Sequence, residues 1–175
     1  IRGEIEVDMN ADELRHHNPV KSAILADLTY LIRAEKLGKV LADGVRLVNE
    51  DGDVVSEPDL VFASQESIRS GKVRYVASVD ESDRLVEMEG TPDLVLEVVS
   101  KYSVQKDTIE LPKAYFEGGI PEYWLIAATE KEVDSQLLIR GDQEYVESDK
   151  GSDGYVFSPT LKRSFFLSRT PDGLG

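Results

Sequence analysis

The feature that most constrains the fold is the apolar run over residues 91–100, which reads Thr-Pro-Asp-Leu-Val-Leu-Glu-Val-Val-Ser. Valine and leucine fill both alternating faces of this run, whereas a strand with one wet face alternates apolar and polar residues. The pattern is typical of a central strand that is covered on both sides. We therefore expect a layered domain in which other elements pack on both faces of one sheet.

The rest of the chain supplies helices and strands for such layers. We expect a helix over about 18–37, with Asn18 as its N-cap, Pro19 at the first helical position and Gly38 just past its end. A second helix is expected over about 104–117, where Pro112 marks a first turn or a kink. Strands are expected at 4–9, in a hairpin spanning 40–62 with its turn at 49–53, and at 73–79, 121–126, 132–140, 143–147 and 165–167, whereas 80–89 resembles an acidic loop. This order predicts a mixed α/β (α+β) fold.

The amino-acid composition excludes several kinds of catalytic and metal site. The 175 residues include no cysteine, which excludes disulfides, thiol catalysis and thiolate zinc sites, and only two histidines, His16 and His17, which excludes a multi-histidine metal site. The length fits one domain over 1–175. The net charge of −14 disfavours non-specific binding to polyanions. Without an apolar run of about 20 residues or a signal-peptide pattern, we expect a cytoplasmic protein that does not enter membranes.

Glu97 is the most informative residue, because it lies in the middle of the expected central strand. Burying an ionised carboxylate costs several kcal/mol unless the group is paired or binds a metal. One reading pairs Glu97 with a lysine or arginine from a neighbouring element. The other makes it a metal ligand or a general base, since acids with perturbed pKa values gather at functional sites.

A repeated tetrapeptide is the second signal. Pro-Asp-Leu-Val occurs at 58–61 and again at 92–95, each time at the start of an expected strand. One interpretation is that Asp59 and Asp93 only cap turns, because Pro-Asp is common in the turn before a strand. If the two strands are neighbours, however, Asp59 can approach Glu97, while Asp93 shares a strand face with Glu97. Two such carboxylates, with water, are a usual way to hold Mg²⁺, which activates water and stabilises phosphate charge during in-line displacement.

Basic residues near this site in the sequence could contact a phosphate. Lys106, at the start of the second helix, is read either as a solvated helix end or as a side chain that reaches the carboxylates. Lys101 and Lys113 are further candidates for substrate contacts. His17 is read chiefly as a surface or capping residue, with substrate contact as the alternative. No glycine-rich phosphate loop is present in the sequence.

The central block resembles the Uma-two family of bacterial proteins, which is assigned to the restriction-endonuclease-like, PD-(D/E)xK superfamily. The resemblance rests on the 92–100 run, Lys106-Asp107, Tyr115 and Gly-Ile-Pro-Glu-Tyr-Trp-Leu-Ile at 119–126. Weaker similarity extends upstream through His17-Asn-Pro-Val and the first Pro-Asp-Leu-Val, and downstream through Arg140-Gly and Ser164-Phe-Phe. It covers nearly the whole chain. Family members often run longer, so we expect the C-terminus to be truncated.

The resemblance implies a mixed sheet flanked by helices and a nuclease site that uses Mg²⁺ or Mn²⁺. By position, Asp59 would be the acid of the first motif strand, Glu97 the acid of the (D/E)xK element and Asp93 a supporting metal ligand. Val99 stands where that element has lysine, and the resemblance implies that Lys106 takes over this role. Leu111 and Ala127 also depart from the family pattern, which is consistent with a weakened or lost activity.

Two functions therefore remain open. The first is a metal-dependent endonuclease acting on DNA, with Asp59, Glu97 and Lys106 as catalytic residues. Because DNA affinity depends on neutralising phosphates, this reading requires a basic face beside the acids, formed by Lys72, Arg74, Lys101, Lys106 and Lys113. The second is a non-catalytic module of the same fold that binds protein partners or forms a homodimer, with Glu97 paired internally.

Overall fold

The computed structural model describes residues 2–8, 13–42, 44–77, 85–99, 103–128 and 133–170. Within them, the largest sheet has six strands, and β8 and β9 at its centre are parallel while all other neighbours are antiparallel. Across the sheet, its strands are β11 (Tyr145–Glu147), β10 (Val133–Arg140), β9 (Glu122–Ala128), β8 (Leu94–Val99), β5 (Leu60–Ser64) and β2 (Gly38–Ala42). The expected mixed sheet is confirmed.

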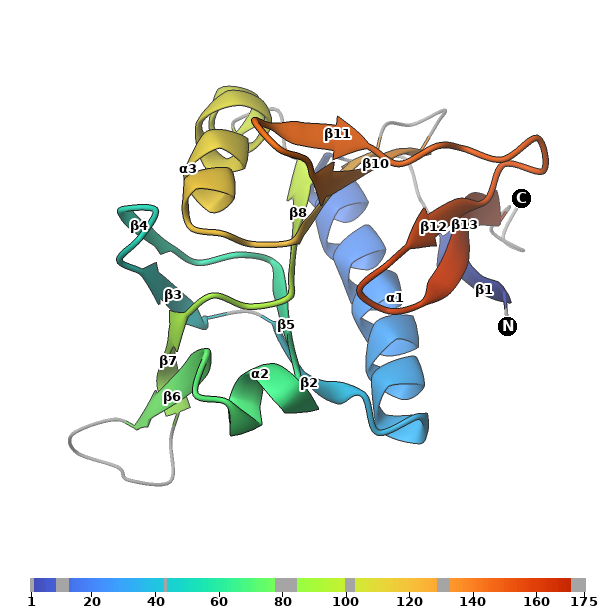
Figure 1. Ribbon diagram of the computed structural model, residues 1–175. Helices are drawn as coiled ribbons and strands as arrows, with labels where there is room; N and C mark the ends of the chain where they lie inside the picture. Colours follow the sequence, from blue (N-terminus) through green and yellow to red (C-terminus); the bar gives the residue numbers. More distant parts are fainter. Residues whose placement is uncertain are drawn as a thin grey trace.

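Two smaller sheets flank the large one in the described residues. The first, of four strands, has the order β4 (Val54–Ser56), β3 (Arg46–Asn49), β7 (Leu85–Gly90) and β6 (Val73–Ala77). The second, of three strands, has the order β1 (Arg2–Asp8), β13 (Arg163–Thr170) and β12 (Val156–Ser158). Figure 1 shows the four-stranded sheet on the α3 side of β8 and the three-stranded sheet on the α1 side.

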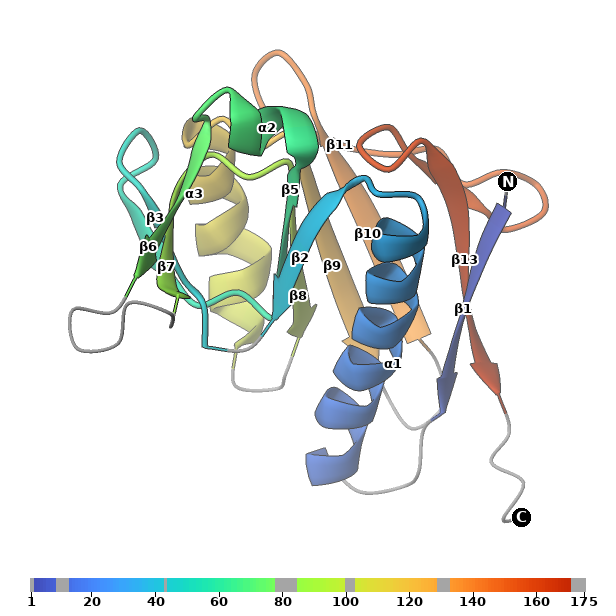
Figure 2. The ribbon, with the colours of Figure 1, turned by 90° about the horizontal axis from the view of Figure 1, so that it is seen from below.

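Helix α1 (Glu13–Ala34) covers one face of the large sheet (Figure 2). Its buried stripe recurs every four residues, as an amphipathic helix requires, and packs against alternate residues of β8. The core on this side consists of helix residues Val20, Ile24, Leu28 and Ile32 together with Leu94, Leu96, Val98, Trp124, Ile126 and others. This face of β8 is therefore sealed from water.

The opposite face packs against α3 (Leu111–Glu117) and the four-stranded sheet. Here Val95 of β8 joins Tyr115 of α3, Met88 of β7 and Leu47 of β3 in a second buried cluster. The strand β8 is thus apolar and covered on both faces, which confirms the central position expected for it. Because side chains alternate along a strand, Glu97 shares the α3 side with Val95.

The first helix begins earlier than its sequence indicated. It starts at Glu13, so Asn18 and Pro19 lie inside it, and the expected N-cap is wrong. Pro19 is the seventh residue of α1, beyond the first turn, so it lacks the backbone N–H that would complete one hydrogen bond of the helix. The helix also ends at Ala34, where Lys36 takes a φ of 55° and Leu37 N–H donates to the Ile32 carbonyl at 3.0 Å.

Gly38 therefore starts β2 instead of capping the helix. A Cβ at this position would lie 2.1 Å from the Ala63 carbonyl oxygen of β5. Glycine is required there because the two backbones approach closely.

The 40–62 hairpin is correct only in its centre. Strands β3 and β4 pair across the expected turn, but β2 pairs with β5, so the segment is divided between two sheets. The acidic segment, expected to be a loop, contains β7 from residue 85 onward, and residues 80–84 lie outside the described residues. Glu87 and Glu89 alternate with the buried Met88 and pair with arginines of neighbouring strands, so their charges do not oppose a strand.

The second helix spans the region expected for it but contains a wide turn. Residues 106–110 form the π-helical segment η1 (Lys106–Glu110), in which Leu111 N–H donates to the Lys106 carbonyl. Pro112 follows in the first turn of α3, where its missing N–H is tolerated. Such wide turns are frequent at functional sites. This one leaves Lys106 exposed and Asp107 buried.

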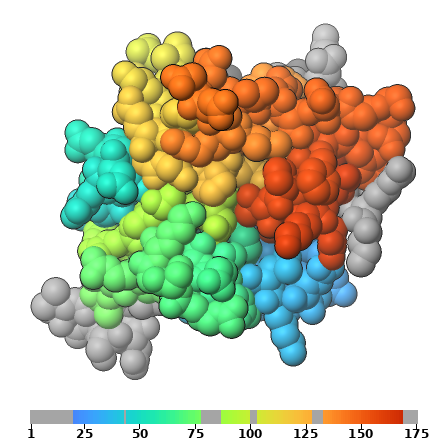
Figure 3. Space-filling view, in the orientation of Figure 1, coloured from blue at the N-terminus to red at the C-terminus, as the bar shows by residue number. Residues whose placement is uncertain are grey.

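A short helix, α2 (Gln65–Arg69), follows β5 and was not predicted from the sequence. It is capped by the Ser64 side chain. Figure 3 shows α3, in yellow, next to the β10–β11 hairpin, in orange, where the Phe116 and Tyr145 rings make an edge contact at 5.5 Å. Among the described helices, none is both long enough and apolar enough to cross a membrane.

Candidate active site

The candidate site lies where β5 begins and β8 ends. These strands are antiparallel, with Leu60 opposite Leu96, so Asp59 arrives opposite Glu97. The Asp59 backbone N–H donates to Glu97 Oε2 at 3.2 Å, and Asp59 Oδ2 accepts from the Val98 N–H at 2.7 Å. The convergence expected from the repeated tetrapeptide is confirmed for this pair.

Glu97 is held in a buried, acidic environment. Its side chain is 5% exposed, and Tyr115 donates its hydroxyl to Glu97 Oε1 at 3.1 Å. Burial raises the pKa of Glu97 to about 8, and the nearby carboxylates of Asp59 and Asp107 raise it further against the opposing hydrogen bonds. A carboxyl group with this pKa binds a proton at neutral pH unless a cation takes its place.

Lys21 of α1 supplies a positive charge that the sequence reading missed. Its Nζ lies 2.9 Å from Asp59 Oδ1, and the two side chains are only 15% and 14% exposed. In the sequence, Lys21 stands beside the buried stripe of α1 and looks like an ordinary surface lysine. The sequence signal was only its place next to Val20, the first residue of the apolar stripe, and that place does not identify a partner.

The helix opposite contributes Asp107 in place of the expected lysine. Asp107 is 4% exposed, and its backbone carbonyl accepts the Tyr123 hydroxyl at 2.8 Å. Its neighbour Lys106 is exposed, and the Lys106 side chain makes no hydrogen bond or ion pair with the residues that the structure describes. The sequence predicted a role for Lys106 because it is basic. In the wide turn η1, however, Asp107 is the buried residue and Lys106 is exposed.

Asp93 lies at the other end of β8, away from the pair. Its carboxylate accepts from the Ser64 N–H at 2.6 Å and from the Ser67 hydroxyl at 2.8 Å, and Lys72 Nζ is 3.8 Å away. It precedes Glu97 by four positions, which is about 13 Å along an extended strand. The structure therefore does not bring Asp93 to Asp59 and Glu97.

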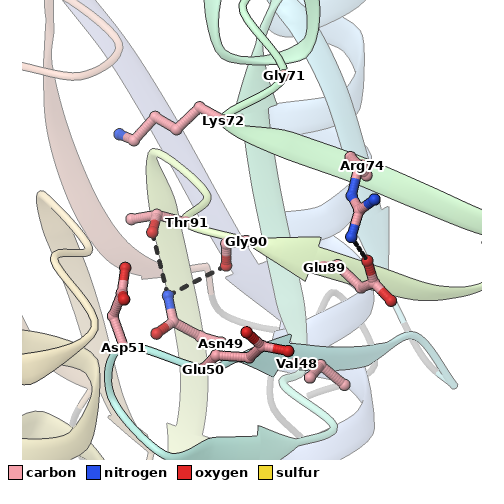
Figure 4. Close-up of a pocket in the computed structure, with 10 residues that line it drawn as sticks. All are labelled: Val48, Asn49, Glu50, Asp51, Gly71, Lys72, Arg74, Glu89, Gly90 and Thr91. Atoms are coloured by element: carbon pink, nitrogen blue, oxygen red, sulfur yellow. Dashed lines mark hydrogen bonds and ion pairs between the residues drawn. The ribbon is translucent and has the colours of Figure 1, made fainter.

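The other expected basic residues that the structure describes are dispersed and paired with acids. Lys72 and Arg74 line a polar pocket at the Asp93 end with Asn49, Glu89 and Thr91, and Arg74 pairs with Glu89 (Figure 4). On α3, Lys113 Nζ lies 3.9 Å from Glu117. Lys101 lies outside the described residues, as does the side chain of His17. The described lysines and arginine of this set thus form no common basic face beside Glu97, so the described residues do not supply the basic face that the endonuclease hypothesis requires.

The donor chemistry of the pair suits a hard divalent cation. Carboxylate oxygens are the ligands that Mg²⁺ prefers, usually with several waters. A cation would also relieve the repulsion that Asp59 and Asp107 exert on Glu97. Within the described part of the chain, no group of three or more histidine, aspartate or glutamate side chains is arranged to hold a metal ion. Asp59 and Glu97, on adjacent strands, supply two carboxylates of the kind that such a cation prefers.

Known proteins share the fold and the family pattern. The Uma2 family model, described as "putative restriction endonuclease", matches residues 1–168. One solved structure, described as a putative nuclease belonging to DUF820 from Anabaena variabilis, superposes with a TM-score of 0.60 at 16% identity. The match covers 89% of this chain and 77% of that one. No curated protein matches the chain.

Proposed function

The chain belongs to the Uma2 family of putative restriction endonucleases, and from this premise we propose that it is an endonuclease that uses Mg²⁺ or Mn²⁺ to hydrolyse phosphodiester bonds of DNA. The observation that carries the proposal is the juxtaposition of Asp59 with the buried Glu97. Burying a carboxyl group beside two others destabilises the folded state. Such destabilising groups occur at functional sites, and a cation site would account for this one.

Asp59 and Glu97 would hold the cation, each through carboxylate oxygens. When bound, the ion would activate water and neutralise charge on the phosphate. Glu97 must lose its proton to bind the cation, because a ligand carboxylate is ionised. Since the pKa of Glu97 is about 8, affinity for the cation should rise with pH through the neutral range.

The basic residues have separate proposed roles. Lys21 orients the Asp59 carboxylate through its ion pair at 2.9 Å. Lys106, exposed at the start of η1 and next to Asp107, is proposed to reach the phosphate from the solvent side. Lys101, Lys113 and His17 are proposed to contact the DNA outside the reacting group. The acidic protein would rely on these few contacts, so its DNA affinity should be low and should fall only modestly as salt rises.

Nicking of supercoiled plasmid in the presence of Mn²⁺ tests the proposal. We expect the wild-type protein to nick the plasmid, and Glu97→Ala and Asp59→Asn to lose this activity. Asp93→Asn is the matched control, since it changes an aspartate at the far end of the same strand. Nicking by Glu97→Ala at the wild-type rate would show that any nuclease activity comes from elsewhere.

A non-catalytic module of the same fold is the second candidate. It is favoured by the pairing of Asp59 with Lys21, which satisfies the acid internally, and by the net charge of −14. On this view the protein would bind a protein partner or a second copy of itself. Sedimentation velocity would detect a homodimer, and a protein that dimerises but binds no Mn²⁺ would favour the module.

A further inference from the structure

A buried hydrogen-bond chain leads from the four-stranded sheet to Glu97. Ser56 Oγ of β4 lies 3.0 Å from the Tyr115 hydroxyl of α3, which lies 3.1 Å from Glu97 Oε1 of β8. The three residues are 8%, 0% and 5% exposed. Three elements of the fold therefore meet in one solvent-excluded line of polar atoms.

The direction of this chain is fixed when Glu97 is ionised. A carboxylate only accepts hydrogen bonds, so Tyr115 must donate its single proton to Glu97. Ser56 must then donate to the Tyr115 oxygen. A phenol keeps its proton at neutral pH, so Tyr115 stays a donor. Each donor thus has one acceptor in the chain.

The contacts around the chain hold both the phenol and the carboxylate in place. The Tyr115 ring packs edge-on against Tyr123, with centroids 5.3 Å apart. Glu97 Oε1 accepts from this fixed phenol, while Oε2 accepts from the Asp59 N–H. Rotation of the carboxylate would break both bonds, so its two oxygens have defined positions.

We propose that Tyr115, oriented by Ser56, is a positioning residue that holds the Glu97 carboxylate ready for a cation. This inference rests on the proposed function, because it assumes that Glu97 is a cation ligand. Groups that orient a ligand from behind typically change metal affinity by 10–100-fold when they are removed. Through Ser56, the four-stranded sheet contributes to a site on the six-stranded sheet.

Mn²⁺ titration calorimetry on matched tyrosine variants tests the proposal. Tyr115→Phe removes only the hydroxyl, and we expect it to weaken Mn²⁺ binding about 10-fold. Tyr145→Phe is the control: it removes a hydroxyl that donates to the Ile120 carbonyl at 2.8 Å, from a ring that also packs on Tyr123. It should bind Mn²⁺ as the wild type does, although both variants lose a hydrogen bond that a phenol donates.

Ser56→Ala provides a second variant that leaves every ring in place. We expect it to weaken Mn²⁺ binding by about 3-fold, less than Tyr115→Phe, because the phenol keeps its contact with Glu97. In nicking assays, Tyr115→Phe should lower kcat and leave KM for the plasmid unchanged, since the phenol does not contact DNA.

The outcomes separate this inference from the proposed function. If the wild type binds Mn²⁺ and Tyr115→Phe binds it equally well, the positioning role is wrong while the cation site stands. Equal weakening by Tyr145→Phe would also overturn it, because the effect would then be general destabilisation. If the wild type neither binds Mn²⁺ nor nicks plasmid, the proposed function fails first and the positioning role with it.

Discussion

The two copies of Pro-Asp-Leu-Val have the same sequence but place their aspartates in different environments. Asp93 lies among donors, accepting from Ser64 and Ser67 with Lys72 nearby. Asp59 lies beside another carboxyl group, Glu97, and forms an ion pair with Lys21 of α1. One copy therefore anchors the start of α2, whereas the other helps to build an acidic site.

The antiparallel pairing of β5 and β8 explains the difference. Because antiparallel strands run in opposite directions, a motif that begins both strands lies at opposite ends of the strand pair. Asp59, just before β5, therefore lies next to the C-terminal half of β8, which includes Glu97. Asp93, just before β8, lies next to the end of β5, where Ser64 caps α2. An identical tetrapeptide gains its role from the strand opposite it, and not from its own residues.

The largest expected contrast is in the pH dependence of stability. The pKa of Glu97 is about 8 in the folded protein and near 4.5 when unfolded, so the folded state binds more protons between these values. The free energy of unfolding should then fall as pH rises from 4.5 to 8, by at most about 1.4 kcal/mol per pH unit. Chemical denaturation across this range should show a flatter profile for Glu97→Gln. Asp93→Asn should keep the wild-type slope, and an unchanged slope in Glu97→Gln would contradict the raised pKa.

The second contrast is stabilisation by a cation. A ligand at about 100 times its Kd stabilises a folded protein by about 2.7 kcal/mol. We expect this gain with Mn²⁺ in the wild type and in Asp93→Ala, and none in Asp59→Ala, by thermal unfolding with and without the ion. If Mn²⁺ failed to stabilise Asp93→Ala but still stabilised Asp59→Ala, the cation would bind at the Asp93 end of β8, which would contradict the account.

The third contrast compares the two lysine–aspartate pairs. Lys21 and Asp59 are mostly buried at 2.9 Å, whereas Lys72 and Asp93 are 3.8 Å apart with Lys72 40% exposed. We expect Lys21→Met to cost about 2 kcal/mol of unfolding free energy, because it leaves a buried carboxylate without its partner. Lys72→Met should cost less than about 1 kcal/mol. Urea titrations of both variants measure this difference, and equal costs would refute it.

The smallest expected effect concerns the donors around Asp93. Ser67→Ala removes the hydroxyl that donates to Asp93 Oδ1, and we expect a loss of about 1 kcal/mol without any change in Mn²⁺ binding. Urea unfolding and Mn²⁺ calorimetry on the same sample check both parts. A change in Mn²⁺ affinity would mean that the two ends of β8 are coupled.

The sequence was most informative where one local pattern decides the structure. The apolar run around Glu97 gave the central strand, and Pro112 marked the start of α3. It was least informative where distant segments compete for pairing. Nothing local showed that β3 would pair with β7, or that Glu87 and Glu89 would find arginines in neighbouring strands.

The candidate site divides in the same way. Asp59 and Glu97 could be chosen from the sequence because burial of one and repetition of the other were visible there. Lys21 could not, because it comes from the opposite face of the sheet and its contact depends on how α1 packs. Asp107 was passed over for Lys106, since a regular helix gives no sign of the wide turn that buries it.

The central claim is that Asp59 and Glu97 together bind a divalent cation. Calorimetric titration of Mn²⁺ into the wild type and Glu97→Ala, at pH 8 where half of Glu97 is ionised, tests it most directly. We expect saturable binding to one site in the wild type and no binding in Glu97→Ala. Absence of binding to the wild type, or equal binding to both proteins, would contradict the claim.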